Sequence, residues 1–211
     1  MLAKKNKKRG ELMGIFDEFT YKNGEIIDNR WVKWYHWGVP DQEGKERESI
    51  RGEIATIGHC MSCSVLSGCY FVKSKLPKKK AEGNGLLHPH CDCKLISIAK
   101  PITIIAHCPI EKFSGYIFSE KYLSNGKKKL FEKLGFSIKD AYHLKTEYER
   151  QAKEKYLNGD YIVRGLNPKY GQDINIVIEL LSRSGRKIKL VSGWKVHPLG
   201  FITCNTPLAD D

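Results

Sequence analysis

The stretch Asp173-Ile-Asn-Ile-Val-Ile-Glu-Leu-Leu181 has apolar side chains at alternate positions, with Ile174, Ile176, Ile178 and Leu180 on one face. Such alternation indicates a β-strand with one buried face. The turn Ser182-Arg-Ser-Gly185 connects it to Lys187-Ile-Lys-Leu-Val191, and this spacing predicts a β-hairpin. Working outward, we expect the second strand of the hairpin to extend over Val191–Val196, and further strands at Tyr161–Val163 and Phe201–Cys204.

Two helices are expected before these strands. Residues 126–135 form a short helical pattern that ends at Gly135. Ser137-Ile-Lys-Asp140 resembles a capping box, which opens a helix by pairing side chains with the first backbone N–H groups. The apolar positions after it keep helical spacing until Asn158-Gly159. The sequence therefore predicts an α+β domain over residues 102–211, with two helices followed by an antiparallel sheet. The apolar positions of the longer helix are Ala141, Leu144, Tyr148, Ala152 and Tyr156.

Two short clusters of cysteine and histidine indicate a metal site. They are Cys60-Met-Ser-Cys63 and His88-Pro-His-Cys91-Asp-Cys93. Thiolate and imidazole are preferred ligands of Zn²⁺, which structural sites hold in a tetrahedron of four. Four reduced structural cysteines, or a disulfide, are the alternatives, and zinc explains the spacing better. Deaminase-type catalytic zinc sites need a His-x-Glu element that is missing here, so we expect a structural zinc.

The choice of the four zinc ligands stays open within the second cluster. Cys60, Cys63 and Cys93 are expected ligands, and Cys91 and His88 compete for the fourth position. We expect a zinc module over residues 51–101, with strands at Gly52–Gly58, Tyr70–Val72 and Lys94–Ile98. Seven cysteines, four of them clustered, fit a reducing compartment. The other three, Cys69, Cys108 and Cys204, are read as buried or inert thiols.

The formal net charge of +12 indicates a polyanionic partner, most often DNA or RNA. The first basic run would be an arm that follows phosphates, and the second would project from the loop between the two metal clusters. A solvated surface is the alternative for each run. A third run, Lys127-Lys-Lys129, has a weaker claim to phosphate binding. The expected nucleic-acid-binding residues are Lys4, Lys5, Lys7, Lys8, Arg9, Lys78, Lys79 and Lys80.

Residues 1–50 combine the basic arm with an aromatic stretch that holds Trp31, Trp34 and Trp37. Three tryptophans in seven residues could stack on nucleic-acid bases. We favour a hydrophobic plug that docks this segment onto a core. The first fourteen residues are basic and polar rather than a leading apolar segment. No apolar run approaches the roughly 18–20 residues of a membrane span, so we expect no membrane contact.

The two metal clusters, with Leu66-Ser67-Gly68 and the step His88-Pro89, resemble the cysteine-rich end of Mu F-like phage minor head proteins. In that family a Cys-x-x-Cys, a following Gly and a His-Pro-x-Cys-x-Cys close a small metal-binding module. The resemblance covers residues ~58–96 and implies a shortened relative, because the family's long preceding helical region has no obvious copy here. It implies capsid or portal proteins as partners, and the virion or the cytoplasm of a bacterial host as the location.

Residues 110–211 resemble an uncharacterised domain family of prophage proteins and polymorphic toxins, through Gly126-Lys127, Leu134-Gly135, Tyr170-Gly-Gln172, Ser192-Gly-Trp194 and Thr206-Pro207. We therefore expect a minor head-associated structural or interaction protein that is not an enzyme. The alternative is an RNase-like toxin or effector, since small ribonuclease toxins also place helices before a sheet. Phosphodiester cleavage needs a base, an acid and a cation. The candidate groups are His143, Tyr161, Arg164, Tyr170, Lys189 and His197, and nothing in the sequence brings them together.

Overall fold

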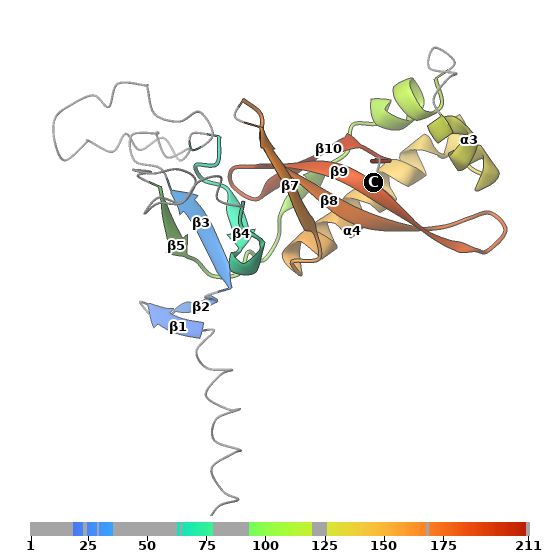
Figure 1. The fold of residues 1–211 in the computed structure, drawn as a ribbon. Helices are drawn as coiled ribbons and strands as arrows, with labels where there is room; N and C mark the ends of the chain where they lie inside the picture. Colours follow the sequence, from blue (N-terminus) through green and yellow to red (C-terminus); the bar gives the residue numbers. More distant parts are fainter. Residues whose placement is uncertain are drawn as a thin grey trace, which may run out of the picture.

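The computed structural model describes residues 19–22, 25–28, 30–35, 63, 65–77, 93–119, 126–167 and 169–209. These residues form an α+β fold with a five-stranded sheet, a three-stranded sheet and a two-stranded hairpin (Figure 1). The predicted α+β class is confirmed. No helix in the described ranges is long and apolar enough to cross a membrane.

The large sheet is mixed, with strand order β6-β10-β9-β8-β7. The last four strands of the chain pair antiparallel, as predicted: β7 (Ile162–Asn167), β8 (Gly171–Leu181), β9 (Lys187–His197) and β10 (Phe201–Thr206). The prediction of a wholly antiparallel sheet is wrong at one edge, where β6 (Ile105–His107) runs parallel to β10. This strand has only three residues, and the first and last are exposed. It is therefore too short for a sequence pattern to reveal.

One long helix covers one face of this sheet (Figure 1). It begins with a short 3₁₀ turn, η4 (Ile138–Asp140), and continues as α4 (Ala141–Leu157). The predicted capping box is present, because Ser137 N donates to Asp140 Oδ2 at 2.8 Å. All five predicted apolar positions of the helix are buried, as are the four predicted core positions of β8. The packing of these two apolar faces builds the main core.

A second helix and an aromatic cluster close one end of the sheet. The second helix, α3 (Gly126–Lys133), packs beside η2 (Lys112–Ile117), a π-helical segment. The Phe113 ring packs edge-to-face against Phe131 of α3 and Tyr148 of α4, with ring centroids 6.2 Å and 5.1 Å apart. The chain leaves α3 at Gly135, whose φ of +83° favours glycine. The predicted end of this helix is confirmed.

The small sheet is built around β3 (Trp31–Tyr35), which lies between β4 (Tyr70–Val72) and β5 (Lys94–Ser97). A single 3₁₀ turn, η1 (Lys73–Lys75), follows β4. Trp31 and Trp34 are only 2% and 1% exposed. The interpretation of these two tryptophans as a hydrophobic plug is confirmed, because a buried ring cannot stack on a nucleic-acid base. Trp37 lies outside the described residues.

The small sheet and the C-terminal elements share one core. Trp31 packs edge-to-face against Tyr156 of α4 at 6.0 Å, and the Tyr156 hydroxyl donates to the Tyr70 carbonyl in β4. The Tyr161 hydroxyl accepts the Val72 N–H at 3.4 Å. The small sheet is therefore tied to the start of β7 and the end of α4.

A hairpin of β1 (Phe19–Lys22) and β2 (Glu25–Asp28) precedes the small sheet. It was not predicted, although Asn23-Gly24 between two short runs is a hairpin turn signal in the sequence. The predicted strand Gly52–Gly58 lies outside the described residues.

Candidate functional site

The small sheet brings Cys63 and Cys93, one cysteine from each of the two Cys/His clusters, to the same end. β4 and β5 both run antiparallel to β3, and their first residues pair with Lys33 and Tyr35 near the end of β3. Cys93 immediately precedes β5. Cys63 leads into β4 through a turn in which Leu66 N donates to Cys63 O at 3.2 Å, and Gly68 N donates to Trp34 O at 2.8 Å. Both cysteine side chains therefore lie at this end of the small sheet.

The thiols at this end fit a zinc donor set as far as the structure describes them. Cys63 is fully buried and Cys93 is 7% exposed. Cys60, His88 and Cys91 lie outside the described residues, and within the described ones no group of three or more His, Cys, Asp or Glu side chains could hold a metal. Burial protects thiolate ligands from water and competing thiols, so the pair suits a structural rather than an open, catalytic ion.

The three remaining cysteines are buried, as predicted. Cys69 and Cys108 are fully buried and Cys204 is 3% exposed. Burial raises the pKa of the Cys69 and Cys204 thiols well above the ordinary value. A thiol held in its protonated form is a poor nucleophile and a poor metal ligand, so these side chains pack rather than react.

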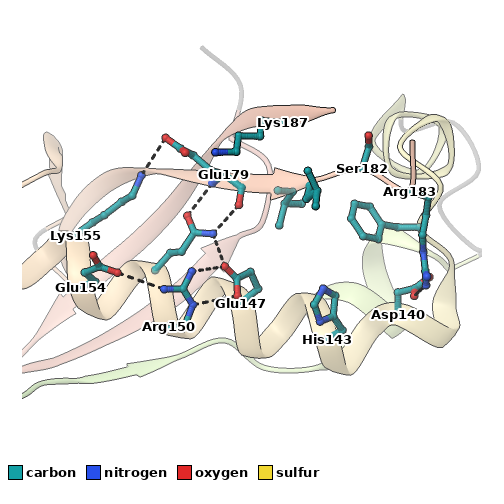
Figure 2. A pocket seen from close by; sticks show the side chains of 14 residues that line it. Asp140, His143, Glu147, Arg150, Glu154, Lys155, Glu179, Ser182, Arg183 and Lys187 are labelled. Carbon is teal, nitrogen blue, oxygen red and sulfur yellow. Dashed lines mark hydrogen bonds and ion pairs between the residues drawn. The ribbon is translucent and has the colours of Figure 1, made fainter. Parts of the chain in front are cut away.

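A groove of about 1000 Å³ lies between α4 and the far end of the β8–β9 hairpin. Figure 2 shows His143, Glu147, Arg150 and Glu154 projecting from α4 on this side. Arg150 donates to both Glu147 and Glu154, and the Arg150 hydrogen bonds lower the pKa of the Glu147 carboxyl. These contacts make Arg150 part of a paired network on α4, and the exposed Lys187 lines the groove from β9.

Side chains of α4 that line this groove also cover an unpaired edge of β8. β7 pairs only with the first part of β8, so the edge of β8 beyond Asn175 has no strand beside it. The Gln151 amide takes the place of a strand, because its Nε2 donates to Glu179 O at 2.6 Å and its Oε1 accepts Glu179 N at 2.8 Å. Lys155 Nζ donates to Val177 O at 2.7 Å. This arrangement explains the groove as part of the fold.

The opposite face of the large sheet is open among the described residues and carries a smaller pocket of about 280 Å³. Asp173 of β8 lies at its centre, with its carboxylate 3.2 Å from Lys195 Nζ and accepting from Asn205 Nδ2 at 3.0 Å. We name this set, with Arg164 of β7 and Asn175 of β8, the open-face pocket. It joins polar side chains from four adjacent strands.

The six candidate catalytic groups are divided by the fold. Tyr161 is 2% exposed inside the core, and burial raises its pKa. His143 is exposed on α4 and lines the α4 groove. Lys189 lies near the start of β9, and its Nζ is 3.7 Å from Glu179 Oε1. Arg164 lines the open-face pocket, and Tyr170 borders it with its ring 5.2 Å from Lys195 Nζ.

The sixth candidate group is His197. It ends β9, is half-buried, and its Nε2 lies 2.8 Å from Thr203 Oγ1. Burial, with a smaller effect of Lys195, lowers the pKa of its imidazole. Histidine has an ordinary pKa near 6.5, so His197 is neutral at pH 7. The structure therefore gathers Arg164, Tyr170 and His197 toward one sheet face and separates them from His143 and Tyr161.

The expected nucleic-acid-binding residues of the first two basic runs lie outside the described residues. The third run is on α3, where Lys127 Nζ donates to Leu208 O at 2.9 Å and Lys128 lies 3.9 Å from Glu132. These two lysines are used within the fold, which agrees with the weaker claim of this run to phosphate binding.

Sequence reasoning missed Asp173, Lys195 and Asn205. Each is a polar residue on the outward face of an alternating strand, a pattern that only indicates solvent exposure. Their meeting depends on strand register, which a single sequence does not reveal. Comparisons of the chain with protein-family models, curated proteins and solved structures find no match. Its function is therefore inferred from its own residues.

Proposed function

We propose that this chain is a phage or prophage minor head-associated interaction protein with one structural zinc ion. Cys60, Cys63 and Cys93 would hold the metal, and either Cys91 or His88 would complete the tetrahedron. The observation that carries this proposal is the convergence of buried Cys63 and Cys93 at one end of the small sheet. When bound, zinc supplies cross-linking energy to a module with little core of its own.

The small sheet gives the zinc a structural purpose. Its strands β4 and β5 contact only three and four residues of partner strand, which is too little for a sheet to be stable alone. Docking through Trp31 joins it to α4, and a zinc at the opposite end would fix the loops between the strands. A rigid loop presented by a stable domain suits a capsid or portal partner, with the basic arm contacting DNA or RNA.

The head-associated role is tested by induction of the phage or prophage that encodes the chain. We expect the protein to be present in purified virions by mass spectrometry, and a Cys93→Ser chain to be depleted from them. A wild-type chain that stays wholly in the cytoplasmic fraction while virions form would overturn this role.

The second candidate function is an RNase-like effector, and His197 is the observation that favours it. A neutral imidazole could accept the proton of a ribose 2′-hydroxyl as that oxygen attacks the adjacent phosphorus and the bond from phosphorus to the 5′-oxygen breaks. The imidazolium so formed could then return the proton to the leaving 5′-oxygen. Lys195 and Arg164, on the same sheet face, could stabilise the charge that develops on the phosphoryl oxygens. The groups thus supply a base and cations.

An RNA-degradation assay with two histidine variants tests this second function. His197→Ala should abolish cleavage, whereas His143→Ala, on the other side of the sheet, should cleave as the wild type does. Purified wild-type protein that leaves RNA intact would rule out the effector.

A further inference from the structure

Two β-bulges flank the open-face pocket. In β7, Arg164 and Gly165 lie opposite the single residue Asp173, because Val163 pairs with Ile174 and Leu166 pairs with Gln172. In β10, Asn205 is the extra residue, since Cys204 pairs with Trp194 and Thr206 pairs with Gly193. Bulges redirect side chains and are frequent next to functional sites. Here both bulged strands contribute a bulge residue, Arg164 and Asn205, to the same pocket.

A buried side chain holds the first bulge in place. Gln172 is 1% exposed, and its Nε2 donates to Gly165 O at 2.8 Å and to Asp173 O at 2.7 Å. A buried amide that binds the bulge carbonyl fixes the backbone beside Arg164. This makes the β7 bulge a built feature rather than an irregularity of a strand edge.

Gly193 of β9 lines the pocket and, because it has no side chain, leaves space at the bottom of the pocket. Its φ is outside the left-handed region, so its backbone conformation does not call for glycine. A Cβ at this position would meet Thr206 Cγ2 at 3.1 Å. Glycine inside a strand weakens the strand, and it often marks a point where a ligand or another backbone comes close. A side chain at residue 193 would fill the hollow between Asn175 and Thr206.

The charges of the pocket leave one cation available. Asp173 is balanced by Lys195, and Asn205 also donates to it. Arg164 is exposed and has no hydrogen bond or ion pair with any residue that the structure describes. A guanidinium can bind two oxygens of one phosphate, and the amides of Asn175 and Asn205 match the donor and acceptor edge of a base.

We propose that the open-face pocket binds one nucleotide of a single-stranded nucleic acid. The phosphate lies against Arg164, and the base edge faces the Asn175 and Asn205 amides. Tyr170 lies at the rim, with the ammonium groups of Lys169 and Lys195 each 5.2 Å from the centre of its ring. The volume of about 280 Å³ suits one nucleotide and no more. This binding site would serve either proposed function, and it requires neither zinc nor cleavage.

The test is fluorescence anisotropy of the full-length chain with short labelled oligonucleotides of DNA and of 2′-O-methyl RNA. Neither probe has the 2′-hydroxyl that cleavage needs, so failure of the effector proposal would not affect the result. The variants are Arg164→Gln and Gly193→Val. The matched control is Arg186→Gln. Arg186 is an exposed arginine in the hairpin turn, and its substitution removes the same charge as Arg164→Gln.

We expect Arg164→Gln and Gly193→Val to weaken binding about tenfold, with Arg186→Gln within twofold of the wild type. Loss of the one phosphate contact in Arg164→Gln should reduce the slope of log K against log salt by roughly 0.7. Loss on both probes indicates recognition of phosphate and base, and loss on the RNA probe alone indicates recognition of the sugar as well. Unchanged melting temperatures verify folding. Equal binding by Arg164→Gln and Arg186→Gln, or no binding by the wild type, would overturn the proposal.

Discussion

At the scale of single residues, polar side chains complete the fold where the sheet leaves backbone groups unpaired. Gln151 is the clearest case, because one amide binds both the N–H and the C=O of Glu179. Its place inside a helix pattern gives no sign of this role. A sequence pattern assigns a polar residue on a helix to solvent, whereas Gln151 is 5% exposed.

Gln151→Ala should lower the free energy of unfolding by about 1–3 kcal/mol, because two backbone groups of β8 lose their partner. Lys153→Ala is the matched control, since Lys153 is exposed on the same helix. Urea denaturation of both variants measures the difference. Equal stabilities of the two variants would show that water replaces the amide without loss.

Asp140 makes the stability depend on pH in the acid range. The Ser137 N–H, with smaller contributions from the Ser137 hydroxyl and Arg183, lowers the pKa of its carboxyl below the ordinary value. A lowered folded pKa means that the stabilisation is complete above the unfolded pKa of about 3.9 and is lost as pH falls through the folded value. Asp140→Asn should therefore be less stable than wild type at pH 6, and the difference should shrink as pH falls below the unfolded pKa. Unfolding curves across this range measure it, and a constant gap would contradict the assignment.

At the scale of elements, the sequence predicted individual helices and hairpins better than it predicted the details of strand pairing. The capping box at Ser137, the helix to Leu157 and the β8–β9 hairpin are all present, because each depends on residues close in sequence. The parallel strand β6 was missed because its pairing with β10 joins segments that are distant in sequence. The two bulges lie between neighbouring strands, but a one-residue shift of register leaves no pattern in a single sequence. The open-face pocket follows from those bulges, so it could not be predicted either.

The small sheet should be energetically coupled to α4 through Trp31 and Tyr156. Their rings meet edge-to-face at 6.0 Å. A double-mutant cycle of Trp31→Leu and Tyr156→Leu should give a coupling energy of about 0.5–1.5 kcal/mol, because each single variant already loses the shared contact. The same cycle with Trp34 in place of Trp31 is the control, since Trp34 packs against Phe71 within the small sheet. Additive losses in the Trp31 cycle would mean that the two elements are stable independently.

At the scale of the whole molecule, the chain combines a large sheet that α4 supports with a small sheet whose far end carries Cys63 and Cys93. The large sheet and α4 share an extensive core, whereas the small sheet has only three short strands. The proposed zinc ion would explain why so small a sheet has two cysteines at the end opposite its docked tryptophan. The zinc is proposed whether the protein serves a phage head or acts on RNA.

Zinc content measured together with thiol reactivity tests the proposed zinc ion most directly. Elemental analysis of the full-length protein should find about one zinc per chain, and Cys63→Ser and Cys93→Ser should each lose it. With zinc bound, a thiol reagent should modify few cysteines. After chelation it should reach the clustered cysteines, while Cys69, Cys108 and Cys204 stay protected by burial. A metal-free protein with the same melting temperature as the purified wild type, before and after chelation, would contradict the account.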